Sequence, residues 1–393
     1  MFKSSISEAE KNFISYLPKT GLYYERNRNY SLDVQTKENT TSLLSPYIRY
    51  RAISEETILK KVIEYSGTKK AEKYIQEIFW RTYWKGWLEH KSDVYLDYIN
   101  EKNKLLEEFK NKKYYLNAIN ANTNLSFFNE WIRDLKENGY LHNHIRMWFA
   151  SIWIFTLKLP WQLGADFFMQ NLLDGDPASN TLSWRWSAGI QTKGKNYLAR
   201  KNNIEKYSNI KLKPNEILEE DAVPLIENKD YKISNLEISN ISNNLDILNI
   251  IIPSDEINIL KDLKIKKCNA FGGYPKEDYN DHNFSKKILH HIKNLVLSCY
   301  RDDDFYKNID IETSFDNYYS DLDKWIVKKN IKIIHLPYVT QGNWKKIYKK
   351  IIKKYPSINF ITFNRNYDIN SWIYSKKGYF KFKQNIPEII KNL

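Results

Sequence analysis

The chain has 393 residues, which is more than one typical domain and enough for two. Hydrophobic residues make up 42% of it, and the formal net charge of +14 favours a polyanionic partner, nucleic acid before anionic membrane. Two cysteines, Cys268 and Cys299, exclude a disulfide framework and indicate a reducing compartment.

The start of the chain is polar and acidic from Ser5 to Glu10, unlike a signal peptide. The longest apolar stretch, Met147 to Leu157, is shorter than the roughly 20 residues that cross a membrane. We therefore expect a soluble, cytoplasmic protein.

Residues 1–205 have the pattern of an all-helical domain. Apolar residues recur three or four positions apart over 55–65, 69–90, 125–136 and 141–158, and Pro160 opens a further helix over 161–173. Residues 206–244 are polar and are typical of a connector.

The pattern changes after the connector. Short β-branched runs at 245–252, 331–339 and 359–363 alternate with helical stretches at 284–299, 319–329 and 343–354. This alternation predicts a smaller C-terminal α/β domain, residues 245–393, with a mainly parallel sheet.

Three polar motifs follow one another in the helical part. Residues 41–45 read Thr-Ser-Leu-Leu-Ser, residues 77–81 read Glu-Ile-Phe-Trp-Arg, and a longer motif begins with Gly-Tyr-Leu-His-Asn-His-Ile-Arg-Met at 139–147. It continues through Asp-Gly-Asp-Pro-Ala-Ser-Asn at 174–180 to Trp-Arg-Trp at 184–186. A Thr/Ser turn before a helix offers donors to phosphate, although the same residues also form plain helix caps.

The two carboxylates of the acidic turn are costly to bury without partners. We expect Arg146 to pair with Asp174. A metal site at Asp174 and Asp176 is the competing interpretation, and the lack of nearby His or Cys residues argues against it. We predict no metal.

In this order the motifs resemble those of the FAD-binding helical domain of the DNA photolyase and cryptochrome superfamily, over about residues 20–200. The resemblance is closest to the photolyases that act on cyclobutane pyrimidine dimers. It implies FAD as cofactor, and it implies these contacts to it: Tyr24, Thr41, Ser42, Leu43, Leu44, Ser45, Tyr74, Arg81, Arg146, Asp174, Gly175, Asp176 and Asn180.

The resemblance also implies a catalytic pocket for a flipped-out dimer. Trp80 and Trp186 match the indoles that sandwich the dimer, and Glu77 matches the carboxylate that hydrogen-bonds it. Asn143 and Met147 match further pocket residues, and Asn180 matches the residue that faces flavin N5. A buried Asn that caps a turn and an indole that packs in a core are the structural alternatives.

Two further sets of roles follow from the same resemblance. Trp184 and Trp161 match the inner members of the family's electron-transfer chain; the third member has no clear counterpart, with Tyr114, Tyr115 and Trp87 as alternatives. DNA contacts are expected from residues that would lie beside the pocket: Arg28, His144, Arg185, Lys193, Lys195 and Arg200. His144 replaces the family's usual arginine, and a solvated basic loop is the alternative for 193–201.

The sequence thus predicts a light-dependent enzyme, a deoxyribodipyrimidine photo-lyase, that splits pyrimidine dimers in DNA by electron transfer from photoexcited reduced FAD. A cryptochrome-like photoreceptor without repair activity is the alternative, and a flavin-free basic DNA-binding protein is a third. We expect a monomer with no membrane partner. The C-terminal domain is interpreted as a relocated antenna-type domain, with its pigment, a folate or a deazaflavin, left open.

Overall fold

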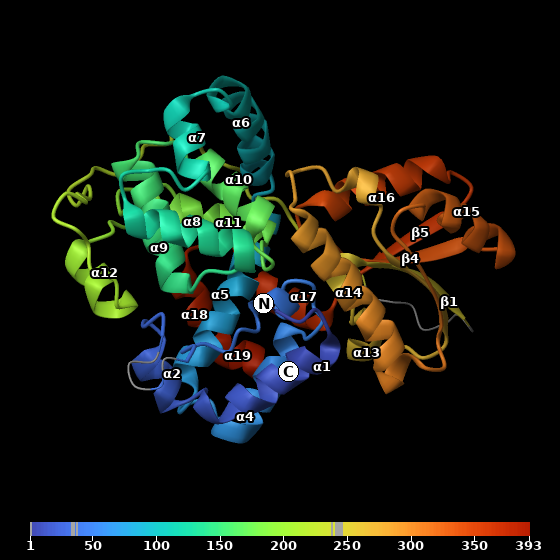
Figure 1. Cartoon of the computed structure of the whole chain (residues 1–393). Coiled ribbons are helices and arrows are strands. Elements are labelled where there is room, and N and C mark those ends of the chain that lie inside the picture. Colours follow the sequence, from blue (N-terminus) through green and yellow to red (C-terminus); the bar gives the residue numbers. More distant parts are fainter. Residues whose placement is uncertain (1, 33–35, 37, 237–238, 240–246) are drawn as a thin grey trace.

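The computed structural model describes residues 2–32, 36, 38–236, 239 and 247–393 (Figure 1). Residues 237–238 and 240–244 of the expected connector, and the first two residues of the expected strand 245–252, lie outside the described residues.

The first half of the chain is helical, as predicted. Its helices are α1 (Ile6–Tyr16), α2 (Leu22–Asn27), α3 (Ser45–Ile48), α4 (Glu55–Ser66), α5 (Glu72–His90), α6 (Asp93–Phe109), α7 (Lys113–Ile119), α8 (Ser126–Asn138), α9 (Asn143–Ser151), α10 (Trp161–Asn171), α11 (Pro177–Ser187) and α12 (Lys201–Ser208).

Local signals in the sequence set several helix ends. The Ser54 hydroxyl accepts a hydrogen bond from the Thr57 amide and caps α4, and Asp176 caps α11 in the same way. Gly139 ends α8 in the left-handed conformation, with φ of 69°. The expected helix 141–158 is divided, because α9 passes into a π-helical turn at Ile152–Thr156 before Pro160 starts α10.

The second part of the chain contains a five-stranded parallel sheet in the order β3-β2-β1-β4-β5, which confirms the predicted fold class. Its strands are β1 (Leu248–Pro253), β2 (Cys268–Gly273), β3 (Asp310–Ser314), β4 (Ile333–Pro337) and β5 (Asn359–Phe363). The helices between and beside them are α13 (Ile259–Asp262), α14 (Lys286–Asp302), α15 (Tyr318–Lys328) and α16 (Asn343–Lys354). The central strand is the most apolar, and Ile250, Ile251 and Ile252 are fully buried.

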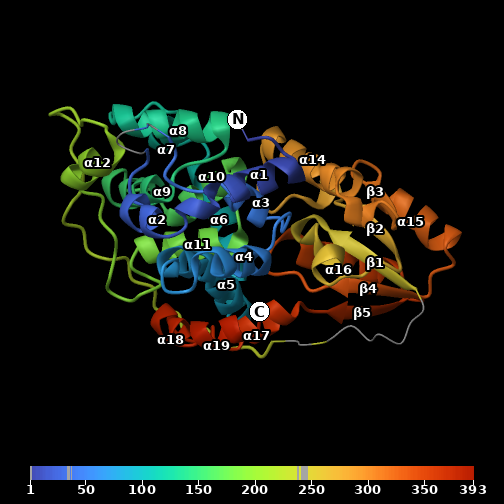
Figure 2. The same ribbon diagram turned by 90° about the horizontal axis from the view of Figure 1, so that it is seen from below.

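The last helices leave the sheet and return to the helical part. They are α17 (Asn366–Trp372), α18 (Tyr379–Lys383) and α19 (Ile386–Lys391), and Figure 2 shows them along α5. The approach is close, since a Cβ on Gly86 of α5 would lie 2.5 Å from the Trp372 ring. Residues 366–391 of the expected C-terminal domain therefore pack with the helical domain, and its expected end at residue 205 falls inside α12.

The two parts share a buried ionic network. The Arg51 guanidinium lies 2.7 Å from each carboxylate oxygen of Asp368 on α17, 2.9 Å from Glu256 after β1 and 3.1 Å from Glu55 on α4. Arg49 pairs with Asp255 at 3.2 Å. The carboxyl end of β1 therefore faces the helical part.

No helix in the described part of the chain is long and apolar enough to cross a membrane.

Candidate functional site

The Thr/Ser motif forms a turn that leads into α3. Leu43 has φ of 55°, a left-handed conformation that is uncommon for a residue with a side chain. The Tyr74 hydroxyl donates to the Ser42 Oγ at 3.2 Å, and the Thr41 Oγ1 lies 3.3 Å from the Tyr140 hydroxyl. Tyr24 packs edge-on against Tyr74 with ring centroids 5.0 Å apart. The hydroxyls of this loop are thus held in place by tyrosines from α2, α5 and the start of the third motif.

The acidic turn connects α10 to α11, and each of its carboxylates has a basic partner. Arg146 donates to the Asp174 Oδ2 at 2.8 Å, which is the ion pair that the sequence predicted. Arg49 donates to the Gly175 carbonyl at 2.6 Å, so the backbone of the turn is also fixed. Asp174 keeps its Oδ1 buried without a hydrogen-bond partner among the described residues.

Asp176 has a different role from Asp174. Its Oδ1 accepts from the Ser179 amide at 2.8 Å, and its Oδ2 lies 3.5 Å from Arg81. Burial raises its pKa, but the charges of Arg81, Lys85 and Arg49 outweigh burial and hold the pKa well below its usual range. Arg81 also donates to Glu55 at 3.0 Å, so it connects this turn to the ionic network around Arg51.

Helix α11 carries several polar groups that the protein does not satisfy. The Asn180 side-chain amide donates to the Ala165 carbonyl at 2.8 Å, which fixes its orientation beside α10. Within the described residues, four buried atoms of this region lack a hydrogen-bond partner: Asp174 Oδ1, Ser179 Oγ, Thr181 Oγ1 and Trp184 Nε1. Because buried polar groups are normally paired, this concentration indicates where a polar ligand would bind.

The expected dimer-pocket residues lie on three helices. Glu77 and Trp80 are on α5, Asn143 and Met147 are on α9, and Trp186 is on α11, which packs against both other helices. The Asn143 side-chain amide lies 4.0 Å from the Met147 sulfur.

Three of these expected pocket residues have partners within the chain. Glu77 forms an ion pair with Arg28; burial raises the pKa of Glu77, and Arg28 opposes that effect. Trp186 stacks on Tyr197 with centroids 5.6 Å apart. Trp80 stacks on Tyr379 of α18, which no pattern near Trp80 in the sequence could have indicated.

Trp184 and Trp161, the two indoles expected to transfer electrons, contact different aromatic rings. Trp184 has ring contacts with Phe149, Trp153 and Phe168, and its centroid is 6.3 Å from that of Trp153. Trp161 stacks on Tyr98 at 5.5 Å and lies 5.9 Å from the Arg185 guanidinium. Trp153 lies in the same motif, but the sequence did not indicate that its ring contacts Trp184.

The residues expected to contact DNA differ in exposure. Lys195 and Arg200 are exposed, and Lys193 is exposed beside Asp230. His144 lies half-buried, stacked on Trp148. Arg185 is 4% exposed and makes two hydrogen bonds with Glu227, at 2.7 and 2.6 Å, so its charge does not face solvent. We therefore remove Arg185 from the set of DNA contacts.

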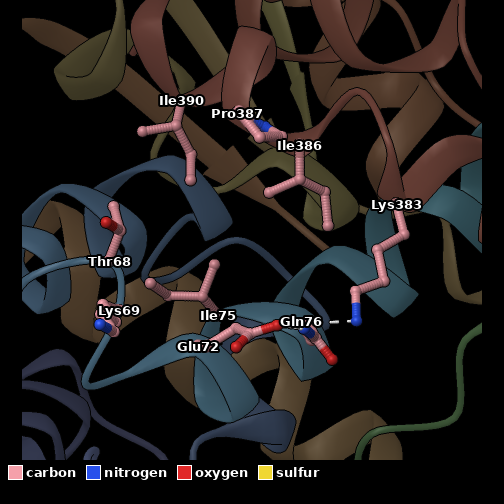
Figure 3. Close-up of a pocket in the computed structure, with 9 residues that line it drawn as sticks. All are labelled: Thr68, Lys69, Glu72, Ile75, Gln76, Lys383, Ile386, Pro387 and Ile390. Carbon is pink, nitrogen blue, oxygen red and sulfur yellow. Dashed lines mark hydrogen bonds and ion pairs between the residues drawn. The ribbon is translucent and has the colours of Figure 1, made fainter.

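A separate groove of about 440 Å³ lies between α5 and the last two helices (Figure 3). Its lining residues are Thr68, Lys69, Glu72, Ile75, Gln76, Lys383, Ile386, Pro387 and Ile390, and none belongs to the motifs above. Within the described residues, no group of three or more His, Cys, Asp or Glu side chains is arranged to hold a metal ion.

Comparison with known proteins shows what this site resembles. Residues 74–215 match the family model described as the FAD binding domain of DNA photolyase. The chain is 32% identical over 174 residues to a deoxyribodipyrimidine photo-lyase of Buchnera aphidicola subsp. Baizongia pistaciae, over 42% of this chain and 35% of that protein. It is 29% identical over 153 residues to a deoxyribodipyrimidine photo-lyase of Alkalihalophilus pseudofirmus, over 39% of this chain and 32% of that protein. The match thus spans about a third of the length of these relatives.

Among solved structures, a class III photolyase from Agrobacterium tumefaciens aligns with a TM-score of 0.43 and 23% identity, over 52% of this chain and 42% of that one. A cryptochrome of Synechocystis sp. PCC6803 aligns with a TM-score of 0.44 and 18% identity, over 52% of this chain and 44% of that one.

The helical scaffold, hydroxyl-bearing turn and acidic turn, together with the family match, define a flavin-binding domain. Residues 74–215 are similar to the FAD binding domain of DNA photolyase, which indicates FAD as the cofactor of this part of the chain. The residues present fit that cofactor, since hydroxyls, paired carboxylates and unpartnered polar atoms are the donors and acceptors that a dinucleotide needs.

Proposed function

We propose that this chain is a light-dependent DNA repair flavoprotein that splits cyclobutane pyrimidine dimers, with damaged DNA as its partner. The observation that carries the proposal is the set of expected dimer-pocket residues on α5, α9 and α11, with α11 packed against both of the other helices next to the flavin-binding motifs. We extend it to the C-terminal α/β domain, interpreted as an antenna-type domain in swapped order with its pigment left open.

In this proposal the loop hydroxyls of Thr41, Ser42 and Ser45 bind the pyrophosphate of FAD. The Arg146–Asp174 pair and Asn180 hold its flavin end. When bound, FAD supplies light absorption and an electron that the dimer returns after it is split, so no general acid or metal is required.

The pocket residues bind the flipped-out dimer. Trp80 and Trp186 stack on the flipped pyrimidines, and each stacked base contributes about 1–3 kcal/mol. Glu77 takes the place of the carboxylate that hydrogen-bonds the dimer; burial raises its pKa, and Arg28 opposes that effect. Extrusion of the lesion costs a few kcal/mol and is cheapest where base pairing is already damaged.

A cryptochrome-like photoreceptor is the second candidate, and one observation favours it. The indole of Trp80 is stacked on Tyr379 and Glu77 is paired with Arg28, so part of the proposed pocket is engaged by the protein itself.

One experiment distinguishes the two candidates. The reduced, flavin-containing protein is illuminated with a thymine-dimer oligonucleotide, and restored thymines are measured by chromatography against a dark sample. We expect light-dependent restoration that Trp186→Ala lowers. Full flavin content without restored thymines contradicts the repair function and favours the photoreceptor.

A further inference from the structure

The contact of Trp161 with Tyr98 lies where α6 and α10 meet the α/β domain. The two rings are nearly parallel, at an angle of 20°, with centroids 5.5 Å apart. Tyr98 is 2% exposed, and its hydroxyl has no hydrogen-bond partner in the part of the chain that the structure describes. Trp161 therefore has a buried phenol, not solvent, on this side.

A histidine with an orienting carboxylate lies next to this phenol. The rings of Tyr98 and His282 have centroids 6.2 Å apart. The His282 Nδ1 is 2.5 Å from the Asp166 Oδ1, and the other Asp166 oxygen accepts from Gln170 at 2.6 Å. His282 is 3% exposed, and its Nε2 is also buried with no partner among the described residues.

An ionised Asp166 can only accept a hydrogen bond, so the Nδ1 of His282 carries the proton in this contact. A neutral His282 that donates Nδ1–H to Asp166 keeps a lone pair on Nε2, so this nitrogen can accept a proton. Asp166 then stabilises the resulting imidazolium and acts as a positioning residue. Burial raises the pKa of Tyr98 well above its ordinary value, so the phenol cannot lose its proton in advance.

We propose that Tyr98 is the terminal electron donor to the chain of Trp161 and Trp184, which would pass electrons to photoexcited oxidised FAD, and that His282 accepts the proton of Tyr98. This inference rests on the proposed function. One electron passes from Tyr98 to the oxidised indole of Trp161. The Tyr98 O–H bond breaks, and a new N–H bond forms at the His282 Nε2 through one bridging water, because the two atoms are not hydrogen-bonded to each other. The products are neutral Trp161, a neutral tyrosyl radical and an imidazolium paired with Asp166. A soluble thiol reductant returns the electron, and the proton returns to Tyr98.

The chain contains a matched control in Tyr95. Its ring is 5.9 Å from that of Tyr98, it is buried, and its hydroxyl also lacks a partner within the described residues. However, Tyr98 and not Tyr95 is stacked on Trp161. The other ionisable groups beside this site are Asp281 and Lys102, and Lys102 lies 3.7 Å from Asp166.

The test is time-resolved absorption after a blue flash on flavin-containing wild type, Tyr98→Phe, Tyr95→Phe and His282→Gln, in H₂O and D₂O. Tyr98→Phe should lose the tyrosyl radical signal, whereas Tyr95→Phe should keep it. His282→Gln should slow tyrosine oxidation by about a hundredfold, since general-base contributions are typically of that order. The wild-type step should also be slower in D₂O.

The failures of the two proposals are distinguishable. A flavin-containing wild type that forms tryptophan radicals but no tyrosyl radical overturns only this relay, as does a tyrosyl signal that survives Tyr98→Phe. A protein without flavin contradicts the proposed function and the relay together.

Discussion

The phenol ring of Tyr379 lies flat against the indole of Trp80, with centroids 3.4 Å apart and an angle of 10° between the planes. The Tyr379 hydroxyl donates to the Gln76 carbonyl at 3.0 Å, so the ring is anchored to the same helix as the indole. A base that stacks on this face of Trp80 must displace Tyr379. The last helices therefore compete with the substrate of the proposed reaction.

Tyr379→Ala should raise the affinity for dimer-containing DNA by about two- to tenfold, because a stacked aromatic pair is worth about 0.5–1.5 kcal/mol. Fluorescence anisotropy with damaged and undamaged oligonucleotides measures the effect. Affinity for undamaged DNA should stay the same. Tyr379→Phe keeps the stack and loses only the hydroxyl, so it should behave like wild type. Equal gains on both DNAs would contradict this assignment.

Asp174→Ala should lower the flavin content of the purified protein, because it leaves Arg146 without its partner beside the cofactor site. Hydrogen bonds to charged groups contribute about 1.5–3 kcal/mol, which corresponds to a loss of affinity of about ten- to a hundredfold. The absorbance ratio of flavin to protein after dialysis reports it. Asp174→Asn keeps the shape of the side chain and one acceptor, so its flavin content should lie between those of the wild type and Asp174→Ala. Full occupancy in Asp174→Ala would remove Asp174 from the flavin site.

Arg51→Met should lower the free energy of unfolding by about 3–5 kcal/mol, because it leaves Asp368 buried without its cation and removes one of the cations of Glu55 and Glu256, which keep Arg81 and Arg365. Chemical denaturation monitored by circular dichroism measures this loss. Arg51→Lys keeps the charge but not the bidentate contact to Asp368, so its loss should be smaller. Limited proteolysis should cut before α17 sooner in both variants. An unchanged unfolding midpoint in Arg51→Met would show that the network does not stabilise the fold.

His291 makes the stability depend on pH. Burial lowers its pKa to about 4, below the roughly 6.5 of an unfolded chain, while its ring nitrogens contact the Ser4 hydroxyl at 2.7 Å and the Pro46 carbonyl at 3.2 Å. A depressed pKa contributes stability above pH 6.5 that is lost as the pH falls toward 4. The loss for one such group is about 3 kcal/mol. His291→Gln should therefore flatten the decline of stability over this window in pH-dependent denaturation, and identical slopes would contradict the assignment.

Lys195→Ala should weaken binding to damaged and undamaged DNA alike, because its exposed charge can meet phosphate but not the lesion. Loss of one phosphate contact reduces the slope of log K against log salt by about 0.9. A salt titration of both affinities measures it. Arg185→Gln is the matched control, since that buried guanidinium is held by Glu227. A loss confined to damaged DNA would place Lys195 at the lesion.

The sequence predicted what local pattern and motif order determine. Helix periodicity located most of α4, α5 and α8, and the acidic turn indicated the Arg146–Asp174 pair. Strands β2 and β3 were missed, because Cys-Asn-Ala-Phe-Gly-Gly and Asp-Ile-Glu-Thr-Ser lack the β-branched run of a buried strand.

Contacts between distant segments could not be predicted, because no local pattern specifies them. The stack of Tyr379 on Trp80 and the bond between Arg51 and Asp368 join residues about 300 positions apart. The pairing of His282 with Asp166 depends in the same way on how the α/β domain docks on α10.

The return of α17–α19 to α5 has a consequence for synthesis on the ribosome. Helix α5 emerges early, yet the face that receives Trp372, Lys377 and Tyr379 stays uncovered until the whole sheet has been translated. Apolar surface exposed for that time is prone to aggregation, and large proteins commonly fold through such intermediates. The order of translation therefore leaves this face of α5 exposed on the nascent chain until its last helices have been made.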